Sequence, residues 1–391
     1  MDTLSSLLDA DLTEDQREVR RVVRTFAESE LLPHVERYER AGEYPVELIA
    51  KLGPMGFLGP MIPEQYGGSR SDIVSYGILC EEIARIDWVV ASVISVGNSL
   101  AGSSILAHGT DAQKERWLPA IASGECLASA CLTEPGGGTD LGNMRTTARK
   151  TDKGYALNGT KVFISHAAHA GLFFVVATLD REKKHRGVTA FLVDPKTTDG
   201  ITINDIPMRT LRRDNLAEVV FEDAEVPAEA LLGEEGGGFP ILGSALDVGR
   251  FSVAARCVGQ AQRALDLSIP QAGEREAFGQ PIGRYQLIQE KIGSMVMRTQ
   301  QARALVYQLG RFKDAGGGRA SLQASMAKLG ASKAAVDNAL DAIQIFGAYG
   351  LAEEYEVGRL LLEAKSLELG EGTSELHTKM IAEFALGYRK Q

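Results

Sequence analysis

The stretch YALNGTKVFI, residues 155–164, decides the fold class, because the hydrophobic pattern changes here from a helical to a strand period. Its Asn158-Gly159 pair lies between two apolar runs and predicts a β-hairpin. Three later runs share its richness in β-branched and aromatic residues: LFFVVATL (172–179), GVTAFLV (187–193) and AEVVFEDAEVP (217–227). No long helical pattern separates these runs, so we expect an antiparallel barrel or sandwich over residues 125–235.

Helical periodicity flanks this segment on both sides. Upstream, Thr13 precedes Gln16 by three residues, the spacing of a capping box, and Pro33 is expected to end the helix that follows. Downstream, one apolar stripe predicts a buried helix face: Ile288, Ile292, Met295, Thr299, Ala302, Val306 and Leu309. A second stripe predicts another: Leu322, Met326, Leu329, Val336, Leu340 and Ile343.

These patterns predict an α+β multi-layer fold with three domains. We expect an N-terminal α-helical domain at residues 1–124, a middle antiparallel β-barrel or sandwich at 125–235, and a C-terminal four-helix bundle at 236–391.

Composition excludes several classes of function. The 391 residues carry a net charge of −10, which argues against general binding of nucleic acid. Four cysteines without a CxxC pair argue against disulfides and zinc, and fit a reducing cytosol. The acidic N-terminus MDTLSSLLDADLTEDQ lacks the basic segment of a signal peptide, and we expect no apolar run near the roughly 18 residues of a membrane span. The sequence therefore predicts a cytoplasmic protein.

Motifs of common nucleotide and metal sites are missing from the sequence. There is no GxGxxG after a strand and no GxxxxGK[ST]. His166 and His169 lie beside an expected strand end without a third ligand, so we expect surface histidines and no metal.

Two glycine-containing segments are candidates for binding. CLTEPGGGTD (131–140) places a strand before three glycines, whose backbone N–H groups suit anionic oxygens or a flat heteroaromatic ring. A plain β-turn explains the same glycines equally well. In REAFGQPIGRYQ (275–286), Arg275 provides a linker with an anion-capable side chain. QIFGAYG (344–350) contains a helix C-cap at Gly347.

GEGTSELHT, residues 370–378, places Glu371 between two glycines after a long apolar run. Glycine neighbours let the backbone approach a ligand, and a carboxylate in an apolar pocket has the raised pKa that a general base needs. The alternative is an ordinary exposed loop glutamate. Glu375 in turn could be a first-turn charge of the next helix.

The order and spacing of these motifs closely resemble the acyl-CoA dehydrogenase family. The resemblance covers essentially the whole chain and rests on CLTEPGGGTD, REAFGQPIGRYQ, QIFGAYG and EGTSE, together with IPEQYGG (62–68) and VGRFSVAARCVGQAQRALD (248–266). It implies bound FAD, a homotetramer, and removal of two hydrogens across the Cα–Cβ bond of an acyl-CoA thioester. An electron-transferring flavoprotein is the implied electron acceptor.

The resemblance assigns two groups of residues to FAD. Near the isoalloxazine ring and the pyrophosphate it places Cys131, Leu132, Thr133, Gly138, Thr139, Phe163 and Ser165. Phe163 stands where many relatives carry tryptophan. For the ADP part, across a subunit interface, it places Arg275, Phe278, Gln286, Gln344, Ile345, Gly347, Ala348, Thr373 and Glu375.

Glu371 matches the family's catalytic base, since the alternative position before Arg250 holds Gly249. In the family a backbone N–H at the base and a flavin ribityl hydroxyl bind the thioester oxygen and stabilise the developing enolate. The resemblance assigns to the substrate Trp88, Val90, Ala91, Ser95, Thr139, Asp247, Arg250, Gly370 and Gly372.

The acyl group is expected to be apolar and short, branched or cyclic. Gly370 replaces a tyrosine that is frequent in relatives, and Ala91 stands where relatives that oxidise glutaryl-CoA carry arginine. Arg85, or a cation from elsewhere, is the alternative partner for a distal carboxylate. The segment Arg212–Asn215 departs from the family's SDT pattern, which leaves its role open.

Other functions on this fold remain as alternatives: an acyl-carrier-protein dehydrogenase, a flavin oxidase or monooxygenase, or a non-catalytic acyl-thioester-binding protein.

Overall fold

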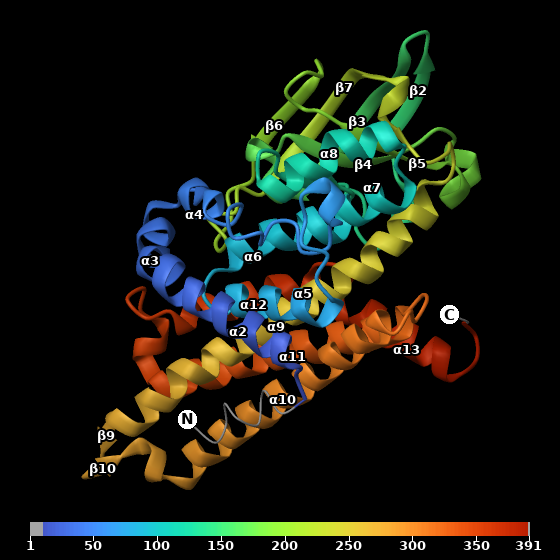
Figure 1. Cartoon of the computed structure of the whole chain (residues 1–391). Coiled ribbons are helices and arrows are strands. Elements are labelled where there is room, and N and C mark those ends of the chain that lie inside the picture. Colours follow the sequence, from blue (N-terminus) through green and yellow to red (C-terminus); the bar gives the residue numbers. More distant parts are fainter. Residues whose placement is uncertain (1–10, 390–391) are drawn as a thin grey trace. The chain divides into compact units, whose positions relative to one another are not determined.

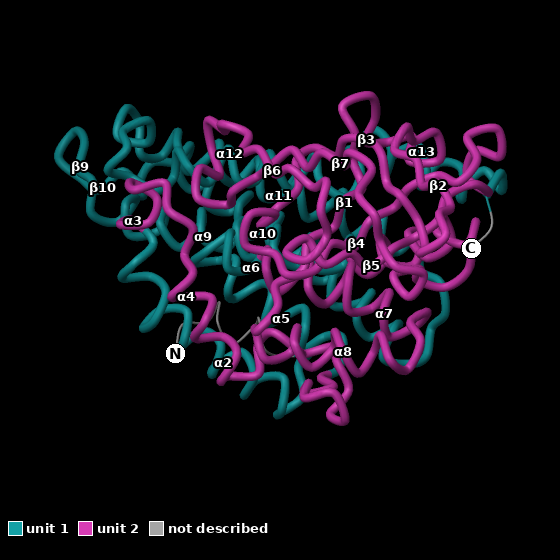
Figure 2. The backbone as a smooth tube through the Cα atoms, turned by 90° about the horizontal axis from the view of Figure 1, so that it is seen from above, with its two compact units in different colours: residues 1–35, 72–91, 250–391 teal, residues 36–71, 92–249 magenta. Residues whose placement is uncertain are grey.

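The computed structural model describes residues 11–389 and divides into two compact units. Unit 1 contains residues 1–35, 72–91 and 250–391, and unit 2 contains residues 36–71 and 92–249 (Figure 2). The expectation that no signal peptide is present concerns residues 1–16, of which residues 1–10 lie outside the described range. The three-domain division at residues 124 and 235 stays a prediction.

Unit 1 is built from helices and one short hairpin (Figure 1). Its elements are α2 (Glu14–Phe26), η1 (Ala27–Leu31), the start of α3 (Leu32–Ala41), α5 (Ile73–Ala84), the start of α6 (Trp88–Ser95), most of α9 (Gly238–Glu274), β9 (Glu276–Ala277), β10 (Gln280–Pro281), η8 (Ile282–Arg284), α10 (Gln286–Asp314), α11 (Ser321–Phe346), η9 (Gly347–Leu351), α12 (Val357–Leu369) and α13 (Ser374–Ala385). Helix α11 packs against α10, α12 and α13, and α5 packs against α2 and α10.

The helix predicted after Thr13 begins where expected but does not end at Pro33. Thr13 Oγ1 accepts from Gln16 N and Gln16 Oε1 accepts from Thr13 N, each at 3.2 Å, which confirms the capping box. The expected end is wrong, because α2 continues through the π-helical turn η1 into α3. Pro33 lies inside this continuous helix, two residues after the π-helical turn, where the regular i→i−4 hydrogen-bond ladder is already interrupted.

One predicted apolar stripe is buried and the other is not. In α10, Met295, Thr299, Ala302, Val306 and Leu309 are buried, whereas Ile288 and Ile292 at the start of the stripe are half-buried. The stripe predicted for α11 is wrong: Met326 is 40% exposed and Leu340 is 50% exposed. The buried face of α11 is instead rich in alanine: Ala324, Ala327, Ala331, Ala335, Ala339 and Ala342. Small side chains allow neighbouring helices to approach closely, whereas Met326 and Leu340 of α11 face outward.

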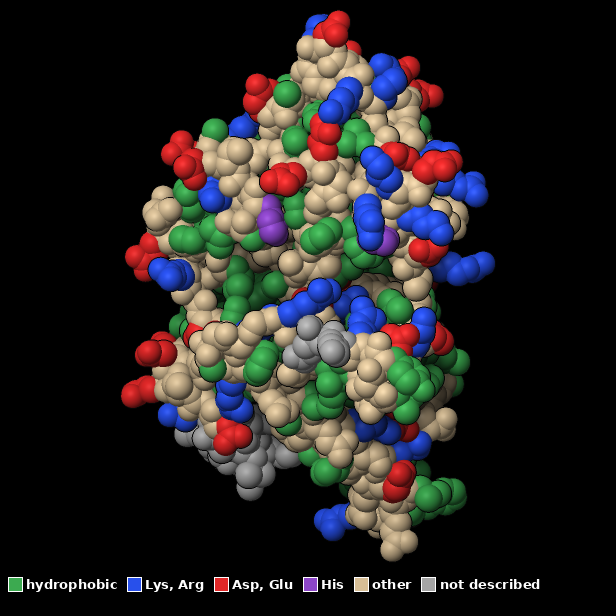
Figure 3. Space-filling view, turned by 90° about the vertical axis from the view of Figure 1, so that its right-hand side faces the viewer, with side chains coloured by type: hydrophobic (Ala, Val, Ile, Leu, Met, Phe, Trp, Pro, Cys, Tyr) green, Lys and Arg blue, Asp and Glu red, His purple; other side chains and the backbone are tan. Residues whose placement is uncertain are grey.

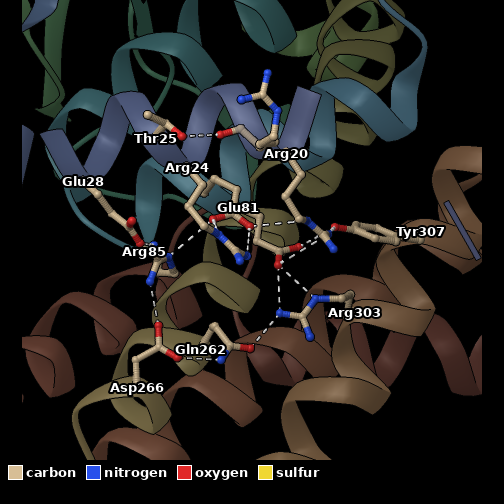
Figure 4. A network of polar contacts seen from close by, with 12 residues as sticks. Arg20, Arg24, Thr25, Glu28, Glu81, Arg85, Gln262, Asp266, Arg303 and Tyr307 are labelled. Atoms are coloured by element: carbon tan, nitrogen blue, oxygen red, sulfur yellow. Dashed lines mark hydrogen bonds and ion pairs between the residues drawn. The ribbon is translucent and has the colours of Figure 1, made fainter. Parts of the chain in front are cut away.

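A buried ionic network joins α5 to α9 and α10 (Figure 4). Glu81 accepts from Arg303 Nε at 2.9 Å and from Tyr307 Oη at 2.8 Å, and all three side chains are buried. Burial opposes ionisation of Glu81, but the arginine charges around it hold its pKa below the usual value. Arg85 is paired in the same network, with Glu28 and, through Nη1 at 2.8 Å, with Asp266. Removing one partner of such a network leaves a buried charge uncompensated.

Unit 2 contains the sheet and the helices that cover it (Figure 1). Its elements are the end of α3, α4 (Val46–Ala50), η2 (Glu64–Tyr66), the end of α6, η3 (Val96–Gly102), α7 (Ser103–His108), α8 (Asp111–Ser123), β1 (Ala128–Cys131), η4 (Leu141–Asn143), β2 (Thr147–Thr151), β3 (Gly154–Ile164), η5 (Ala167–His169), β4 (Leu172–Thr178), η6 (Arg181–Arg186), β5 (Val188–Val193), β6 (Ile201–Asp205), β7 (Ala217–Pro227), η7 (Ala228–Ala230), β8 (Leu231–Leu232) and the start of α9.

The sheet is predominantly antiparallel, which together with the flanking helices confirms the predicted fold class. Its strand order is β6-β7-β3-β2-β4-β5-β8, with β1 beside β4. The β1–β4 pair and a single β2–β4 contact are parallel.

Strand β4 is buried on both faces. Leu172, Phe174 and Val176 join a core with the α8 residues, whereas Phe173 and Val175 join the core on the opposite face. A strand covered on both sides reads as a continuous apolar run, as LFFVVATL does.

The hairpin predicted at Asn158-Gly159 is wrong. Both residues lie inside β3, where the register with β7 shifts, and the hairpin turn lies instead between Thr151 and Gly154. Gly159 has φ 146°, and a Cβ there would lie 2.6 Å from Thr146 Oγ1. Asn158 Oδ1 accepts from Asp223 N at 2.9 Å. The pair therefore marks a bulge where two backbones approach closely.

The segment Trp88–His108 is long and apolar enough to cross a membrane by length and composition, with 21 residues and a mean hydropathy of 1.6. The expectation that no run approaches this length is therefore wrong. In the structure 83% of its apolar window is buried, as in the core helix of a globular protein. The face shown in Figure 3 carries acidic and basic side chains interspersed with hydrophobic ones.

Candidate active site

Glu371 occupies a tight turn between two helices of unit 1. Helix α12 ends at Leu369, where Gly370 N donates to Ser366 O at 2.9 Å, and Thr373 caps the N-terminus of α13. Between them, Glu371 has φ 56° and Gly372 has φ 105°. A left-handed backbone is uncommon for a glutamate, and such strain is concentrated at functional sites.

The carboxylate of Glu371 is shielded from solvent. The residue as a whole is half-buried, but its Oε2 is buried and accepts no hydrogen bond from residues 11–389. Burial raises its pKa to about 7, although the charges of Arg250, Lys328 and Arg256 act in the opposite direction. A carboxylate with this pKa is suited to general base catalysis near neutral pH.

The backbone of the turn leaves a hydrogen-bond donor available. Glu371 O accepts from Arg250 Nε at 3.3 Å. Within the described residues, Glu371 N–H has no acceptor, so it can donate to a ligand that approaches the carboxylate.

The predicted substrate residues on α6 are buried, and their surroundings are apolar or already paired. Trp88 is 6% exposed, and Val90 and Ala91 are fully buried. The Arg256 guanidinium lies 4.7 Å from the centroid of the Trp88 ring. Since Arg85 is engaged by Glu28 and Asp266, the alternative that it meets a distal carboxylate loses support. Ser95 and Asp247 are buried in unit 2.

The residues predicted for the ADP part of FAD lie in unit 1, several of them at its surface. Phe278 in the β9–β10 turn is 98% exposed with φ 52°, and the Arg275 guanidinium lies 5.8 Å from the Tyr349 ring centroid. Gln286, Gln344 and Ala348 are exposed, Gly347 with φ 65° caps α11, and Ile345 is buried in the core. The Thr373 hydroxyl accepts from Leu376 N at 3.4 Å, and Glu375 lies in the first turn of α13, as the alternative reading expected.

The residues predicted for the flavin ring come together in unit 2, where the ends of β1 and β3 lie side by side. Val162 N donates to Thr133 O at 2.9 Å, and Ser129 Oγ donates to Ser165 O at 2.6 Å. Leu132 O accepts from the buried Lys161 Nζ at 3.1 Å. Burial lowers the pKa of Lys161, opposed by Glu134.

Cys131 contributes to this region only through its backbone. Its side chain is fully buried in the sheet core, and burial raises the pKa of its thiol. The thiol therefore faces away from any ligand on the surface of the strand.

The glycine-rich turn after β1 is pinned by Glu134. Glu134 and Gly137 exchange two backbone hydrogen bonds of 3.1 Å, and the Glu134 carboxylate accepts from Arg145 N and Thr146 N. A Cβ at Gly137 would meet no atom within 4 Å, and one at Gly138 would lie 3.4 Å from Thr133 Cγ2. Thr139 is exposed beside this turn.

The residues of unit 2 fit a flavin. Phe163, next to the Val162–Thr133 backbone contact, is 57% exposed with φ 59°, so an aromatic side chain is available to a ligand at this end of β3. The open backbone at Gly137 leaves room for a ligand oxygen to approach.

Several polar residues near the end of β3 are buried, which the sequence did not predict. His166 was expected at the surface, but it is fully buried with its Nδ1 3.2 Å from Asp214 Oδ1. His169 is half-buried and stacks on Tyr44 with ring centroids 4.1 Å apart. Arg213 is fully buried and donates to Glu39 at 2.8 Å. The segment Arg212–Asn215 therefore packs, through Asp214, against the residues that directly follow β3.

Lys328 and His377 beside the Glu371 turn were also missed. Both are fully buried. Lys328 follows Ala324 by four residues and precedes Ala331 by three, so its helical spacing could have placed it on the buried alanine face of α11. His377 had no comparable signal.

Possible metal ligands and cysteines are a further feature of the described residues. Residues 11–389 contain no group of three or more His, Cys, Asp or Glu placed to hold a metal. The four cysteines are free and buried.

Comparison with known proteins covers nearly the whole chain. Profiles of the acyl-CoA dehydrogenase N-terminal, middle and C-terminal domains match residues 13–125, 129–224 and 236–386. An acyl-CoA dehydrogenase of Bacillus subtilis (strain 168) is 40% identical over 377 residues, which cover 96% of this chain and 99% of that protein.

Solved structures share the fold. Butyryl-CoA dehydrogenase from Megasphaera elsdenii superposes with a TM-score of 0.93 at 37% identity, covering 96% of this chain and 99% of that one. The prolyl acyl carrier protein oxidase AnaB superposes with a TM-score of 0.91 at 32% identity, covering 95% and 99%.

Proposed function

We propose that this chain, which belongs to the acyl-CoA dehydrogenase family, oxidises an acyl-CoA to the trans-2-enoyl-CoA with FAD as cofactor and Glu371 as the base. The observation that carries the choice of base is the shielded carboxylate of Glu371, with a pKa of about 7, on a left-handed turn. A carboxylate in that state is ionised enough at neutral pH to act and basic enough to take a weakly acidic proton.

The side chain and the backbone of Glu371 have different roles in the proposed reaction. Glu371 takes the α-proton, the β-hydrogen leaves with both electrons of its C–H bond, and the Cα=Cβ double bond forms. Glu371 N–H donates to the thioester oxygen and stabilises the enolate charge that develops there. Bound FAD supplies the acceptor for the β-hydride. Arg250 fixes the carbonyl of the same turn and thereby its orientation.

FAD binding is proposed for the two groups of residues that the family resemblance names. The flavin ring would lie against the ends of β1 and β3, and Arg275 with Phe278 would meet the ADP part. The support is that Phe163 and Phe278 are exposed aromatic side chains, and that both have the left-handed backbone that is concentrated at functional sites.

The acyl group is proposed to be apolar and short, branched or cyclic. Gly370 has φ −66° and ψ 154°, which any residue adopts, and a Cβ there would meet only Ser366 O at 3.5 Å. The backbone conformation therefore does not require glycine at position 370. The effect of Gly370 is to leave space for the acyl group. Pairing of Arg85 within the ionic network also supports an uncharged acyl end.

We also propose that the enzyme is a homotetramer which passes its electrons to an electron-transferring flavoprotein. Large apolar side chains stay exposed on the isolated chain, among them Phe278, Met326 and Leu340. Exposed apolar surface of this kind is typical of an interface between protein chains. A cytoplasmic location and the three-domain division remain predictions.

Anaerobic mixing of the purified yellow protein with a panel of acyl-CoAs tests the function. Straight, branched, cyclic and dicarboxylic acyl groups should be compared by loss of visible flavin absorbance. We expect apolar short, branched or cyclic acyl-CoAs to bleach the flavin and glutaryl-CoA to fail. Bleaching by none of them would overturn the dehydrogenase assignment, and fastest bleaching by glutaryl-CoA would overturn the apolar one.

A second candidate is an oxidase or dehydrogenase of carrier-bound acyl groups. The likeness to the prolyl acyl carrier protein oxidase AnaB favours its inclusion. Rapid oxygen consumption during turnover, or bleaching by an acyl-carrier-protein thioester but not by the matching acyl-CoA, would select it.

A further inference from the structure

Lys328 contacts the turn that carries Glu371. It belongs to α11, its side chain is fully buried, and its Nζ donates to Glu368 O and to Gly372 O, each at 2.7 Å. Glu368 belongs to the last turn of α12 and Gly372 leads into α13, so the two carbonyls stand on either side of Glu371.

These two hydrogen bonds stabilise a strained backbone conformation. Glu371 has φ 56° and Gly372 has φ 105°, and such a turn persists only when its surroundings over-determine it. Charge-assisted hydrogen bonds to carbonyls on both sides fix the separation of the two helix ends. Arg250 Nε holds the carbonyl of Glu371 itself at 3.3 Å, so two helices supply cations to one turn.

We propose that Lys328 is a positioning residue of the active site, whose ammonium group ties Glu368 O to Gly372 O and so aims Glu371 at the substrate. The inference rests on the proposed role of Glu371 as the base. It assigns a function to a buried lysine whose ammonium group donates to two backbone carbonyls.

Lys328 also contributes positive charge near the base. The titratable groups around Glu371 and Lys328 come from four helices: Arg250, Arg256 and Cys257 of α9, Lys328 of α11, Glu368 of α12 and His377 of α13. Burial lowers the pKa of Lys328 to about 8, so it is mostly protonated at neutral pH. Burial also lowers the pKa of His377, to about 3, so that imidazole is neutral. Loss of the ammonium should therefore raise the pKa of Glu371.

The test compares Lys328→Met with Lys333→Met. Methionine retains most of the apolar stem and removes the ammonium, and Lys333 lies on the exposed side of the same helix. FAD content, the KM for the acyl-CoA, the rate of anaerobic flavin reduction and its pH midpoint should be measured on each holoenzyme. The pH dependence of thermal stability gives a second readout of Glu371 ionisation that needs no turnover.

We expect Lys328→Met to retain FAD and KM but to reduce its flavin on the order of 100-fold more slowly, as a small misplacement of a reacting group does. Its pH midpoint should rise by about one unit, in both readouts. Lys333→Met should match the parent. Should Lys328→Met fail to fold, Lys328→Gln, which keeps a neutral donor, should show the same slowing and the same rise.

A rate and midpoint equal to those of Lys333→Met would overturn the inference. So would a rate loss that follows lost FAD or lowered stability alone, with the midpoint unchanged, because this would mark a purely structural residue. Glu371→Gln in the same assay separates the two claims. If it still reduces flavin, the base assignment fails; if it does not while Lys328→Met behaves as the parent, only the role of Lys328 fails.

Discussion

Replacing Glu371 by glutamine is expected to stabilise the folded chain at alkaline pH while it abolishes flavin reduction. Burial raises the pKa of Glu371 from an ordinary value near 4.5 to about 7. Between these values the folded state holds a proton that the unfolded state has released, so the folded state binds more protons. Stability therefore falls as pH rises through this window.

The magnitude follows from the two pKa values. A difference from 4.5 to about 7, at 1.36 kcal/mol for each pKa unit, corresponds to about 3 kcal/mol once the carboxylate is fully ionised. The cost should be about 1 kcal/mol near pH 5.5 and about 3 kcal/mol near pH 8.5. Glutamine has the same shape without the ionisation, so the variant avoids this pH-dependent cost.

Thermal unfolding of the holoenzymes across this pH range measures the difference. The difference in Tm between Glu371→Gln and the parent should increase by about 2–3 °C between about pH 5.5 and 8.5, given the entropy of unfolding of a chain this long. Glu354→Gln, at an exposed glutamate, is the matched control and should run parallel to the parent. A Tm gap for Glu371→Gln that stays constant with pH would refute the reasoning, because it would mean that Glu371 is not desolvated.

Three further substitutions test other parts of the structure. Gly159→Ala should lower the free energy of unfolding by about 2–3 kcal/mol, since its Cβ would lie 2.6 Å from Thr146 Oγ1. Its control, Gly293→Ala inside α10, places a Cβ with no atom within 4 Å and should raise the free energy of unfolding by up to about 1 kcal/mol. Equal denaturation midpoints for the two variants would contradict this. Tyr307→Phe should cost about 1–3 kcal/mol, because it removes the hydroxyl bound to buried Glu81, and exposed Tyr388→Phe should be neutral in the same denaturation assay. Phe278→Ala should weaken FAD retention and shift the oligomer to smaller species in light scattering, and an unchanged mass with full FAD would count against a shared site.

Features set by neighbouring residues were predictable from the sequence. The capping box of Thr13 and Gln16 and the C-cap at Gly347 depend on contacts within one turn, and both are found. The buried stripe of α10 depends only on the helical period. The placement of Glu371 as the base came from the ordered motifs of the family resemblance rather than from its own flanking glycines.

The features that were missed depend on long-range packing. Asn158-Gly159 has the composition of a hairpin turn, but both residues lie inside β3, where its register with the distant strand β7 shifts. The buried face of α11 is made of alanines because three helices approach it closely, and a search for large apolar residues selects the opposite face. The hydrogen bonds of buried Lys328 go to carbonyls that lie 40 and 44 residues later in the chain.

Anaerobic stopped-flow reduction of the flavin, with the parent and Glu371→Gln at equal FAD content, tests the central claim most directly. The substrate should be whichever acyl-CoA bleaches the parent fastest. The account predicts rapid bleaching by the parent and a rate at least on the order of a thousandfold lower for Glu371→Gln, because the α-proton then has no base. Bleaching of both proteins at comparable rates would contradict it.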